Sequence, residues 1–168
     1  MKILVLKFGG TSVGSIKKIK KVAEIIAEYK KKNYKVIVIS SAMSGVTNEL
    51  IKKSFKLSDN FSDSEHDVLV SSGEQVACSL IAGRLIHKGY KSRSWLAWQV
   101  PIITNGMHKN SRINQIGSHK IIKYLKEGGI PIITGFQGIN NQNRITTIGR
   151  GGSDASAIMI AKFFKAEK

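Results

Sequence analysis

Short apolar runs along this chain alternate with longer segments in which apolar positions recur every three or four residues. The short runs predict buried strands at residues 2–7, 36–39 and 131–134, with further β segments near 92–98, 102–104 and 144–148. The longer segments predict helices at residues 15–32, 47–57, 66–88, 115–127 and 155–164. Continuous runs rich in Ile and Val, separated by helices, indicate parallel strands that are covered on both faces. We therefore expect an α/β fold with helices on both sides of a mostly parallel central sheet.

Polar and glycine-rich stretches mark where these elements end. Residues 58–65 predict a polar linker, and the four Asn and Gln residues at 140–143 predict the tip of a hairpin. The Ser-Ser-Gly sequence at 71–73 predicts a break within the helix at 66–88. The sequence has no internal repeat that would divide the chain into smaller units.

Composition indicates one globular domain. The chain has 168 residues, 42% of them hydrophobic, which is enough for a proper core. Its apolar runs are far too short for a membrane-spanning helix or a signal peptide, so no membrane partner is expected. The single cysteine, Cys78, lies in an apolar helical context and is expected to be a buried, unreactive thiol in a reducing cytoplasm.

The net charge of +16 raises the question of nucleic-acid binding. Residues 75–126 contain no Asp or Glu, yet the 27 basic residues comprise 22 Lys and only five Arg, the residue that base and phosphate contacts favour. The lysines at 17–21 fall on the polar side of an amphipathic helix, as a solvated face would. We expect no specific nucleic-acid partner, but the charge should attract small acidic substrates.

Two glycine-rich turns carry the candidate chemistry. Residues 149–154 (GRGGSD) lie between a β-like run and a helix, where free backbone N–H groups and the helix dipole favour an anion. Asp154 would repel a phosphate there, so a cation is needed nearby. Lys7, at the end of the first strand and followed by Gly9 and Gly10, is the candidate. Both turns follow parallel strands, at whose carboxyl ends ligands bind.

Several familiar motifs are absent. Residues 9–14 have the glycine spacing of a P-loop but lack its Lys-Ser/Thr pair, and residues 149–154 lack the third glycine of a dinucleotide-binding fingerprint. The four histidines are scattered, so no metal site is expected, and no Gly-x-Ser-x-Gly elbow is present.

Five linked segments resemble aspartate kinases (aspartokinases) of the amino-acid kinase family, in the family's order and approximate spacing. They are KFGGTSV at 7–13, SAMSGVTN at 41–48, SGE at 72–74, GFQG at 135–138 and GRGGSD at 149–154. The resemblance covers the whole chain. It implies the amino-acid kinase fold, a three-layer αβα sandwich. It also implies transfer of the ATP γ-phosphoryl group to the side-chain carboxylate of L-aspartate, giving 4-phospho-L-aspartate for lysine, threonine and methionine synthesis.

The resemblance also implies roles for individual residues. Lys7 would stabilise charge on the transferring phosphoryl group, and Asp154 would orient Lys7. Nucleotide phosphates would meet Lys7, Phe8, Gly9, Gly10, Gly151 and Gly152. L-aspartate would meet Ser41, Thr47, Glu74, Phe136, Arg150 and Ser153, with Arg150 on a carboxylate and Glu74 on the ammonium. Mg²⁺ would arrive with ATP, and a cytoplasmic homo-oligomer is expected.

Structural roles compete with these functional ones. Lys7 could simply extend its ammonium to solvent at a strand end, and Thr47 could be only a helix N-cap. Glu74 could close a capping box from Ser71, with Gln75 doing so from Ser72. Trp95 and Trp98 are expected to pack rather than to form a stacking platform.

The family's pattern continues beyond this chain. Aspartokinases extend past the helix at 155–164 into a nucleotide lobe and regulatory domains. Residues 1–168 are therefore expected to form the amino-acid-binding lobe with the phosphate turns, C-terminally truncated, and to show little kinase activity alone. The alternative function is a non-catalytic remnant or an amino-acid-binding module of the same fold. Ala155 and Ser156 stand where the family usually has Thr residues, a difference that a helix should tolerate.

Overall fold

The computed structural model describes residues 2–149 and 151–167. The strands are β1 (Ile3–Phe8), β2 (Lys35–Ser40), β3 (Ser92–Trp95), β4 (Ile102–Thr104), β5 (Ile113–Ile116), β6 (Ile130–Thr134), β7 (Gln137–Ile139) and β8 (Ile145–Thr147). The helices are α1 (Ile16–Lys31), α2 (Val46–Leu57), α3 (Asp63–His87), α4 (His119–Lys126) and α5 (Gly152–Phe163).

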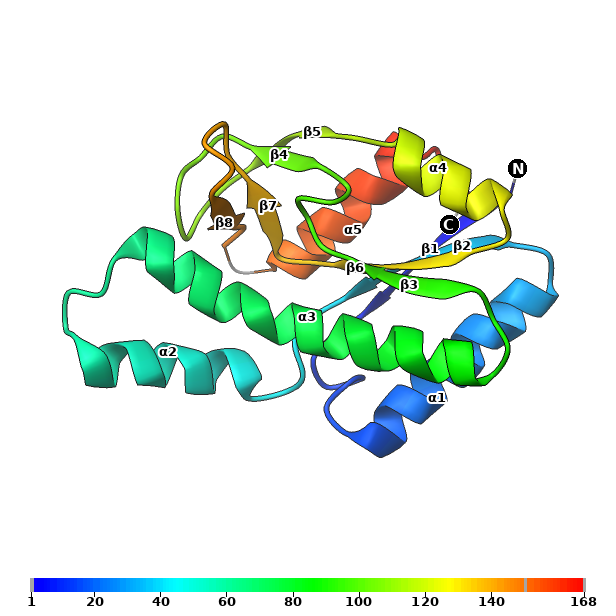
Figure 1. Ribbon diagram of the computed structural model, residues 1–168, viewed down its shortest axis with the longest axis horizontal. Helices are drawn as coiled ribbons and strands as arrows, with labels where there is room; N and C mark the ends of the chain where they lie inside the picture. Colours follow the sequence, from blue (N-terminus) through cyan, green and yellow to red (C-terminus); the bar gives the residue numbers. More distant parts are fainter. Residues whose placement is uncertain (1, 150, 168) are drawn as a thin grey trace.

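The main sheet has the strand order β1-β2-β6-β3, and all of its pairings are parallel. Helices α1 and α3 lie on one side of it, and α4 and α5 on the other (Figure 1). Strand β2 shows why both faces need cover: Val36 and Val38 pack toward α1 and α3, while Ile37 and Ile39 pack toward α4 and α5. The expected three-layer αβα architecture with a mostly parallel sheet is confirmed.

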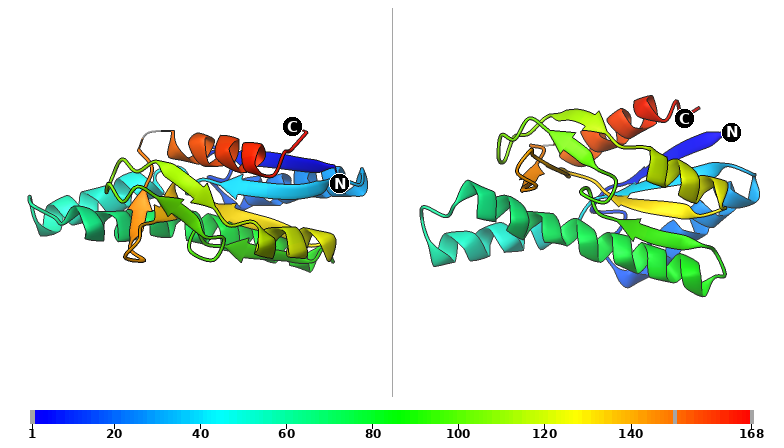
Figure 2. Two further views of the ribbon diagram at one scale, coloured as in Figure 1. Left: turned by 90° about the horizontal axis from the view of Figure 1, so that it is seen from above. Right: turned by 45° about the horizontal axis from the view of Figure 1, so that its top comes forward.

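A second, mixed sheet was not expected. Its order is β5-β4-β7-β8, with β4 and β7 parallel and the two outer pairings antiparallel. The predicted hairpin at 140–143 joins β7 to β8, with Asn143 in the left-handed region at φ 58°. Both views in Figure 2 show α2 and the first half of α3 extending beyond the main sheet. Strand β8 packs against that half of α3, which brings the second sheet to the edge of the main one.

Two helix predictions were wrong in detail. Helix α3 runs unbroken through residues 71–73, where Ser71 and Ser72 donate their hydroxyls to the carbonyls of Val68 and Leu69 within the helix. Residues 113–116 form strand β5 rather than the start of a helix. Gly117 ends this strand against Pro101, whose carbonyl accepts its N–H at 2.8 Å, so α4 begins only at His119.

Candidate active site

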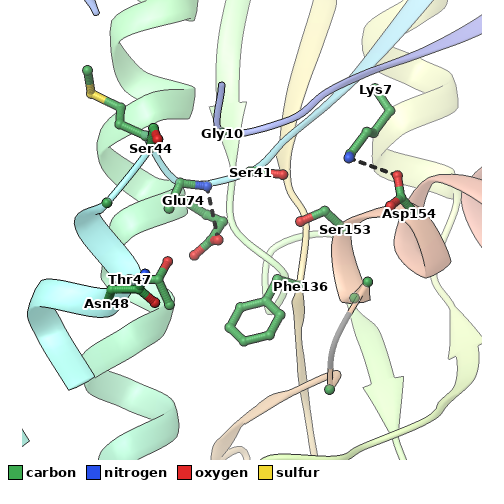
Figure 3. Close-up of a pocket in the computed structure, with 16 residues that line it drawn as sticks. Lys7, Gly10, Ser41, Ser44, Thr47, Asn48, Glu74, Phe136, Ser153 and Asp154 are labelled. Atoms are coloured by element: carbon green, nitrogen blue, oxygen red, sulfur yellow. Dashed lines mark hydrogen bonds and ion pairs between the residues drawn. The ribbon is translucent and has the colours of Figure 1, made fainter. Parts of the chain in front are cut away.

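The two glycine-rich turns meet at the carboxyl ends of β1 and β2, although the second turn follows β8, an antiparallel strand of the second sheet, and not a parallel strand as expected. They enclose an open pocket of about 320 Å³. It is lined by Lys7, Gly10, Ser41, Ala42, Met43, Ser44, Gly45, Thr47, Asn48, Glu74, Phe136, Gly149, Gly151, Gly152, Ser153 and Asp154. Figure 3 shows two facing walls, with Glu74 and Thr47 on one side and Lys7, Ser153 and Asp154 on the other.

Lys7 and Asp154 form an ion pair in this pocket. The Lys7 Nζ lies 2.8 Å from Asp154 Oδ1, which joins the end of β1 to the first turn of α5. A Cβ atom on Gly9 would lie 3.4 Å from the same Nζ, so the glycine leaves space around the ammonium. The carboxylate thus fixes the direction of the lysine while leaving one face of the ammonium toward the pocket (Figure 3).

The N-terminus of α5 opens onto the same space. Its N-cap, Gly151, has φ 74° and offers no side-chain hydrogen bond to the helix. A Cβ atom on Gly152 would lie 2.8 Å from the ring of Phe136, so only glycine lets the turn approach this closely. An uncapped helix N-terminus beside a lysine ammonium favours an anion.

Glu74 provides the opposite charge on the facing wall. Its side chain is only 3% exposed, and Oε1 accepts the backbone N–H of Ala42 at 3.0 Å. Oε2 is buried without a hydrogen-bond partner among the described residues. Burial raises the pKa of Glu74 to about 7, and the Ala42 N–H opposes that rise. An unpaired buried carboxylate oxygen beside a pocket is a site for a cationic group of a ligand.

Gly73 allows Glu74 to reach the pocket. A Cβ atom at this position would lie 2.8 Å from the Cβ of Ala42, closer than such atoms approach in proteins. The glycine therefore serves close packing of α3 against the segment after β2, which the break predicted here did not anticipate.

The Gly73→Ala variant should lower the melting temperature and weaken any ligand held by Glu74, since the added methyl pushes α3 away from Ala42. We expect a loss of about 1–3 kcal/mol in the free energy of unfolding, measured by thermal or urea denaturation. Gly83→Ala is the matched control on the same helix. No atom lies within 4 Å of a Cβ built on Gly83, so this variant should gain about 0.5–1 kcal/mol. Equal effects at the two positions would contradict this packing role for Gly73.

Phe136 lines the pocket in an unusual backbone conformation. Its φ is +67°, in the left-handed region that a non-glycine residue seldom adopts. Two hydrogen bonds hold it there: Ser156 Oγ accepts its N–H at 3.1 Å, and its carbonyl accepts the Ile148 N–H at 2.8 Å. Backbone strain of this kind is concentrated at functional sites. Ser156, treated above as a tolerated difference from the family, is thus a buried anchor for Phe136.

Most of the expected site residues come together here. Lys7, Gly10, Ser41, Thr47, Glu74, Phe136, Gly151, Gly152, Ser153 and Asp154 all line the pocket. The side chain of Phe8 does not, because it lies in the core beneath α1, and Gly9 sits behind Lys7. The prediction for Arg150 falls outside the described residues.

The pocket also includes residues that were not assigned individually, among them Ser44, Asn48 and Gly149. Ser44 and Asn48 belong to the segment at 41–48, so their place within that motif was the available signal. Gly149 is the first residue of the turn at 149–154 that was singled out.

Several structural alternatives can now be decided. The capping-box interpretation of Glu74 is wrong, because residues 71–75 lie in the middle of α3. The N-cap of α2 is Gly45, so Thr47 does not cap that helix. Trp95 is buried and packs edge-on against Tyr124, as expected, whereas Trp98 is 49% exposed. Cys78 is fully buried, and burial raises the pKa of its thiol.

Among the described residues, no group of three or more His, Cys, Asp or Glu side chains could hold a metal ion. Within the same residues, no helix is both long and apolar enough to span a membrane.

The fold and this site define a class of protein. The chain belongs to the amino acid kinase family, whose model matches residues 2–168. Its relatives include aspartokinases. It is 48% identical to the aspartokinase of Rickettsia conorii and 47% identical to that of Geobacillus stearothermophilus, over 100% of this chain but only 43% and 41% of those proteins. The chain thus spans less than half the length of the curated relatives it matches.

Solved structures agree with the fold. Aspartate kinase from Synechocystis is 35% identical, with a TM-score of 0.83 over 99% of this chain and 27% of that one. Aspartokinase III of E. coli, in complex with aspartate and ADP, gives a TM-score of 0.85 at 23% identity over 100% of this chain and 48% of that one. The resemblance to aspartokinases seen in the sequence is therefore confirmed.

Proposed function

We propose that this chain carries the aspartate-binding and phosphoryl-transfer centre of an aspartokinase. The observation that carries the proposal is the pocket itself. In it the Lys7–Asp154 pair faces Glu74, whose Oε2 has no hydrogen-bond partner among the residues that the structure describes. One wall is suited to an anion and the other to a cation. L-aspartate has an ammonium and two carboxylates, and the relatives that match the whole of this chain are named aspartokinases.

In this proposal a side-chain carboxylate oxygen of aspartate attacks the γ-phosphorus of ATP, and the bond between that phosphorus and the β,γ-bridging oxygen breaks. The products are 4-phospho-L-aspartate and ADP, and no proton has to move. The chain's part is positioning and charge neutralisation, as in other phosphoryl transfers. Mg²⁺ would enter bound to the nucleotide phosphates and neutralise part of their charge.

In this proposal the two walls of the pocket bind different groups of the reactants. Glu74 holds the ammonium of aspartate, so the amino acid enters in one orientation. Ser41, Thr47 and Ser153 offer hydroxyls to its carboxylates, and Arg150 is assigned a carboxylate from its sequence motif alone. Lys7 meets the phosphoryl oxygens as charge develops on them, and Asp154 holds Lys7 in place. The glycines at 10, 151 and 152 let phosphates approach backbone N–H groups.

The reaction can be tested by trapping the acyl phosphate with hydroxylamine, which converts it to a coloured hydroxamate. Residues 1–168 alone are expected to form little hydroxamate from MgATP and L-aspartate, and we expect hydroxamate to accumulate once they are joined to the C-terminal half of an aspartokinase. Succinate, which lacks the ammonium, should bind at least about tenfold more weakly because Glu74 then gains no partner. Aspartate binding without any hydroxamate in the joined protein would favour the alternative, an amino-acid-binding module. Equal binding of succinate and aspartate would rule out the role given to Glu74.

A cytoplasmic homo-oligomer is part of the same proposal. ATP as the donor and a single buried thiol fit a reducing compartment. Exposed apolar side chains support self-association, among them Phe55 and Leu57 on α2 and Ile158 and Phe163 on α5. A single monomeric species in sedimentation at micromolar concentration would contradict the oligomer.

A further inference from the structure

A second carboxylate on α3 is buried but does not line the pocket. Asp67 has a side chain with 0% exposure, and it lies two turns before Glu74, about 10 Å along the helix at 1.5 Å per residue. Burying a carboxylate is costly unless hydrogen bonds or opposite charges compensate it. The groups that stabilise the buried carboxylate of Asp67 therefore indicate its structural role.

Its partners come from two other segments. From β8, Thr147 donates its hydroxyl to Oδ1 at 2.6 Å and its N–H to Oδ2 at 3.1 Å. From the segment before β5, His108 Nδ1 lies 2.7 Å from Oδ2, and the Lys109 N–H points at both oxygens at 3.1 and 3.2 Å. The ring of His66 also faces the carboxylate, with Nδ1 at 3.7 Å. We call Asp67, His108, Lys109 and Thr147 the Asp67 clamp.

The clamp leads directly into the glycine turn of the pocket. Thr147 is the last residue of β8, and the next residue, Ile148, donates its N–H to the carbonyl of Phe136. Gly149 follows and lines the pocket. A Cβ atom on Gly149 would lie 2.8 Å from Asn110 Oδ1, so the segment that holds Asp67 also supports the back of this turn.

A second link runs parallel to the first. One turn after Asp67 on α3, the carbonyl of Ser71 accepts the side-chain amide of Gln137 at 3.0 Å. Asp67, Ser71 and Glu74 thus form one stripe of α3 that faces β7, β8 and the pocket. The charge-assisted bonds to Asp67 are the stronger part of this connection. Apolar contacts alone would let the helix slide, whereas hydrogen bonds fix a distance and a direction.

We propose that Asp67 is a positioning residue that fixes the spacing between the two walls of the amino-acid site. It ties the helix carrying Glu74 to the strand that delivers Gly149, Ser153 and Asp154. This inference rests on the proposed function, because that function requires both walls to engage one aspartate molecule. Asp67 itself touches no substrate.

Three variants test the clamp. Asp67→Asn keeps the shape but turns an amide N–H toward groups that are already donors. Thr147→Val removes only the hydroxyl donor, and Thr147→Ser restores it. Glu65→Gln is the control, since Glu65 lies on the same helix but is exposed and pairs with Arg144 on the surface.

Titration calorimetry with L-aspartate gives the first measurement. We expect Asp67→Asn to weaken binding about 10- to 100-fold and Thr147→Val about 3- to 10-fold, because the walls lose their fixed separation. Thr147→Ser and Glu65→Gln should stay within about twofold of the parent chain. In the kinase assay Asp67→Asn should raise KM for aspartate more than KM for ATP.

Amide hydrogen exchange gives a measurement that needs no ligand. Exchange at residues 148–154 should accelerate in Asp67→Asn and Thr147→Val but not in Thr147→Ser or Glu65→Gln. The proposal would be overturned if these variants have lower melting temperatures but keep the exchange rates of this turn and the aspartate affinity of the parent chain. Asp67 would then be only a stabilising contact. If the parent chain binds no aspartate, the proposed function fails, and faster exchange in the turn would still support the clamp. Should Asp67→Asn not fold, the Thr147→Val and Thr147→Ser pair decides.

Discussion

Replacing Lys7 with alanine is expected to lower kcat for phosphoryl transfer about 10²- to 10³-fold, the usual cost of removing one positioned charge-stabilising group. The ammonium is held at 2.8 Å by Asp154 and directed toward the pocket, so it is in place before charge develops on the phosphoryl group. Because it acts mainly in the transition state, the affinity for L-aspartate should change by less than about threefold. Hydroxamate formation by the chain joined to the C-terminal half of an aspartokinase gives kcat, and calorimetry gives the affinity.

Two further variants make this result specific. Asp154→Asn keeps the hydrogen-bonding shape but weakens the hold on Lys7, so we expect a smaller loss in kcat of about tenfold. Lys17→Ala removes an exposed lysine of α1 that does not line the pocket and should leave kcat unchanged. If Lys7→Ala abolishes aspartate binding while kcat per bound substrate is preserved, Lys7 belongs to the amino-acid site rather than to phosphoryl transfer.

The second large effect is expected at Glu74. Its pKa of about 7 means that lowering the pH below 7 protonates the free protein at this site. The ammonium of aspartate requires the ionised carboxylate, so affinity should rise about tenfold per pH unit up to pH 7 and then level off. Glu74→Gln should weaken binding about 10- to 100-fold and remove this pH dependence. Titrations between pH 5 and pH 9 in two buffers would also detect the proton released on binding.

The same residue should affect stability in the absence of ligand. The folded-state pKa of about 7 lies above the carboxyl's usual value of 4.5. The contribution of Glu74 to the free energy of unfolding is therefore fully present below pH 4.5 and is lost as the pH rises through 7. The loss amounts to about 3 kcal/mol for one buried carboxyl, as an order of magnitude. Melting temperatures of Glu74→Gln should lack this decline. Glu49→Gln, an exposed change in the first turn of α2, should retain it. A parental decline in Glu74→Gln would assign the titration to another group.

Much of the fold was predictable because its signals are local. The run at 36–39 is apolar at every position and the run at 131–134 at every position but Thr134, and a strand buried on both faces needs such a pattern. Strands β4 and β8 of the second sheet were predicted as β segments, but β5 was missed because it is short and partly polar, with Asn114 and Gln115 exposed. The pairing that joins the halves of this sheet links Ile103 of β4 to Ile139 of β7, and no local pattern encodes it.

The residues of the candidate site also fall into two groups, those that a local sequence pattern marks and those that only distant partners reveal. Lys7 and Asp154 were found because glycines surround them, and the ion pair between them could be anticipated from charge alone. Asp67 could not be found, because it sits among ordinary helical residues and its partners Thr147 and His108 are 80 and 41 residues away. The break predicted at Gly73 failed because glycine there serves packing against Ala42, a contact that no local pattern encodes.

The strained backbone at Phe136 predicts conflicting selection pressures. Glycine would adopt φ +67° without steric cost, so a library of all substitutions at this position, sorted for thermal resistance, should enrich glycine over phenylalanine. The same library sorted for growth that depends on the enzyme should restore phenylalanine, whose ring fills one side of the pocket. At position 136, variants with higher thermal stability would then have lower catalytic activity, so the two properties could not be improved together by a substitution there.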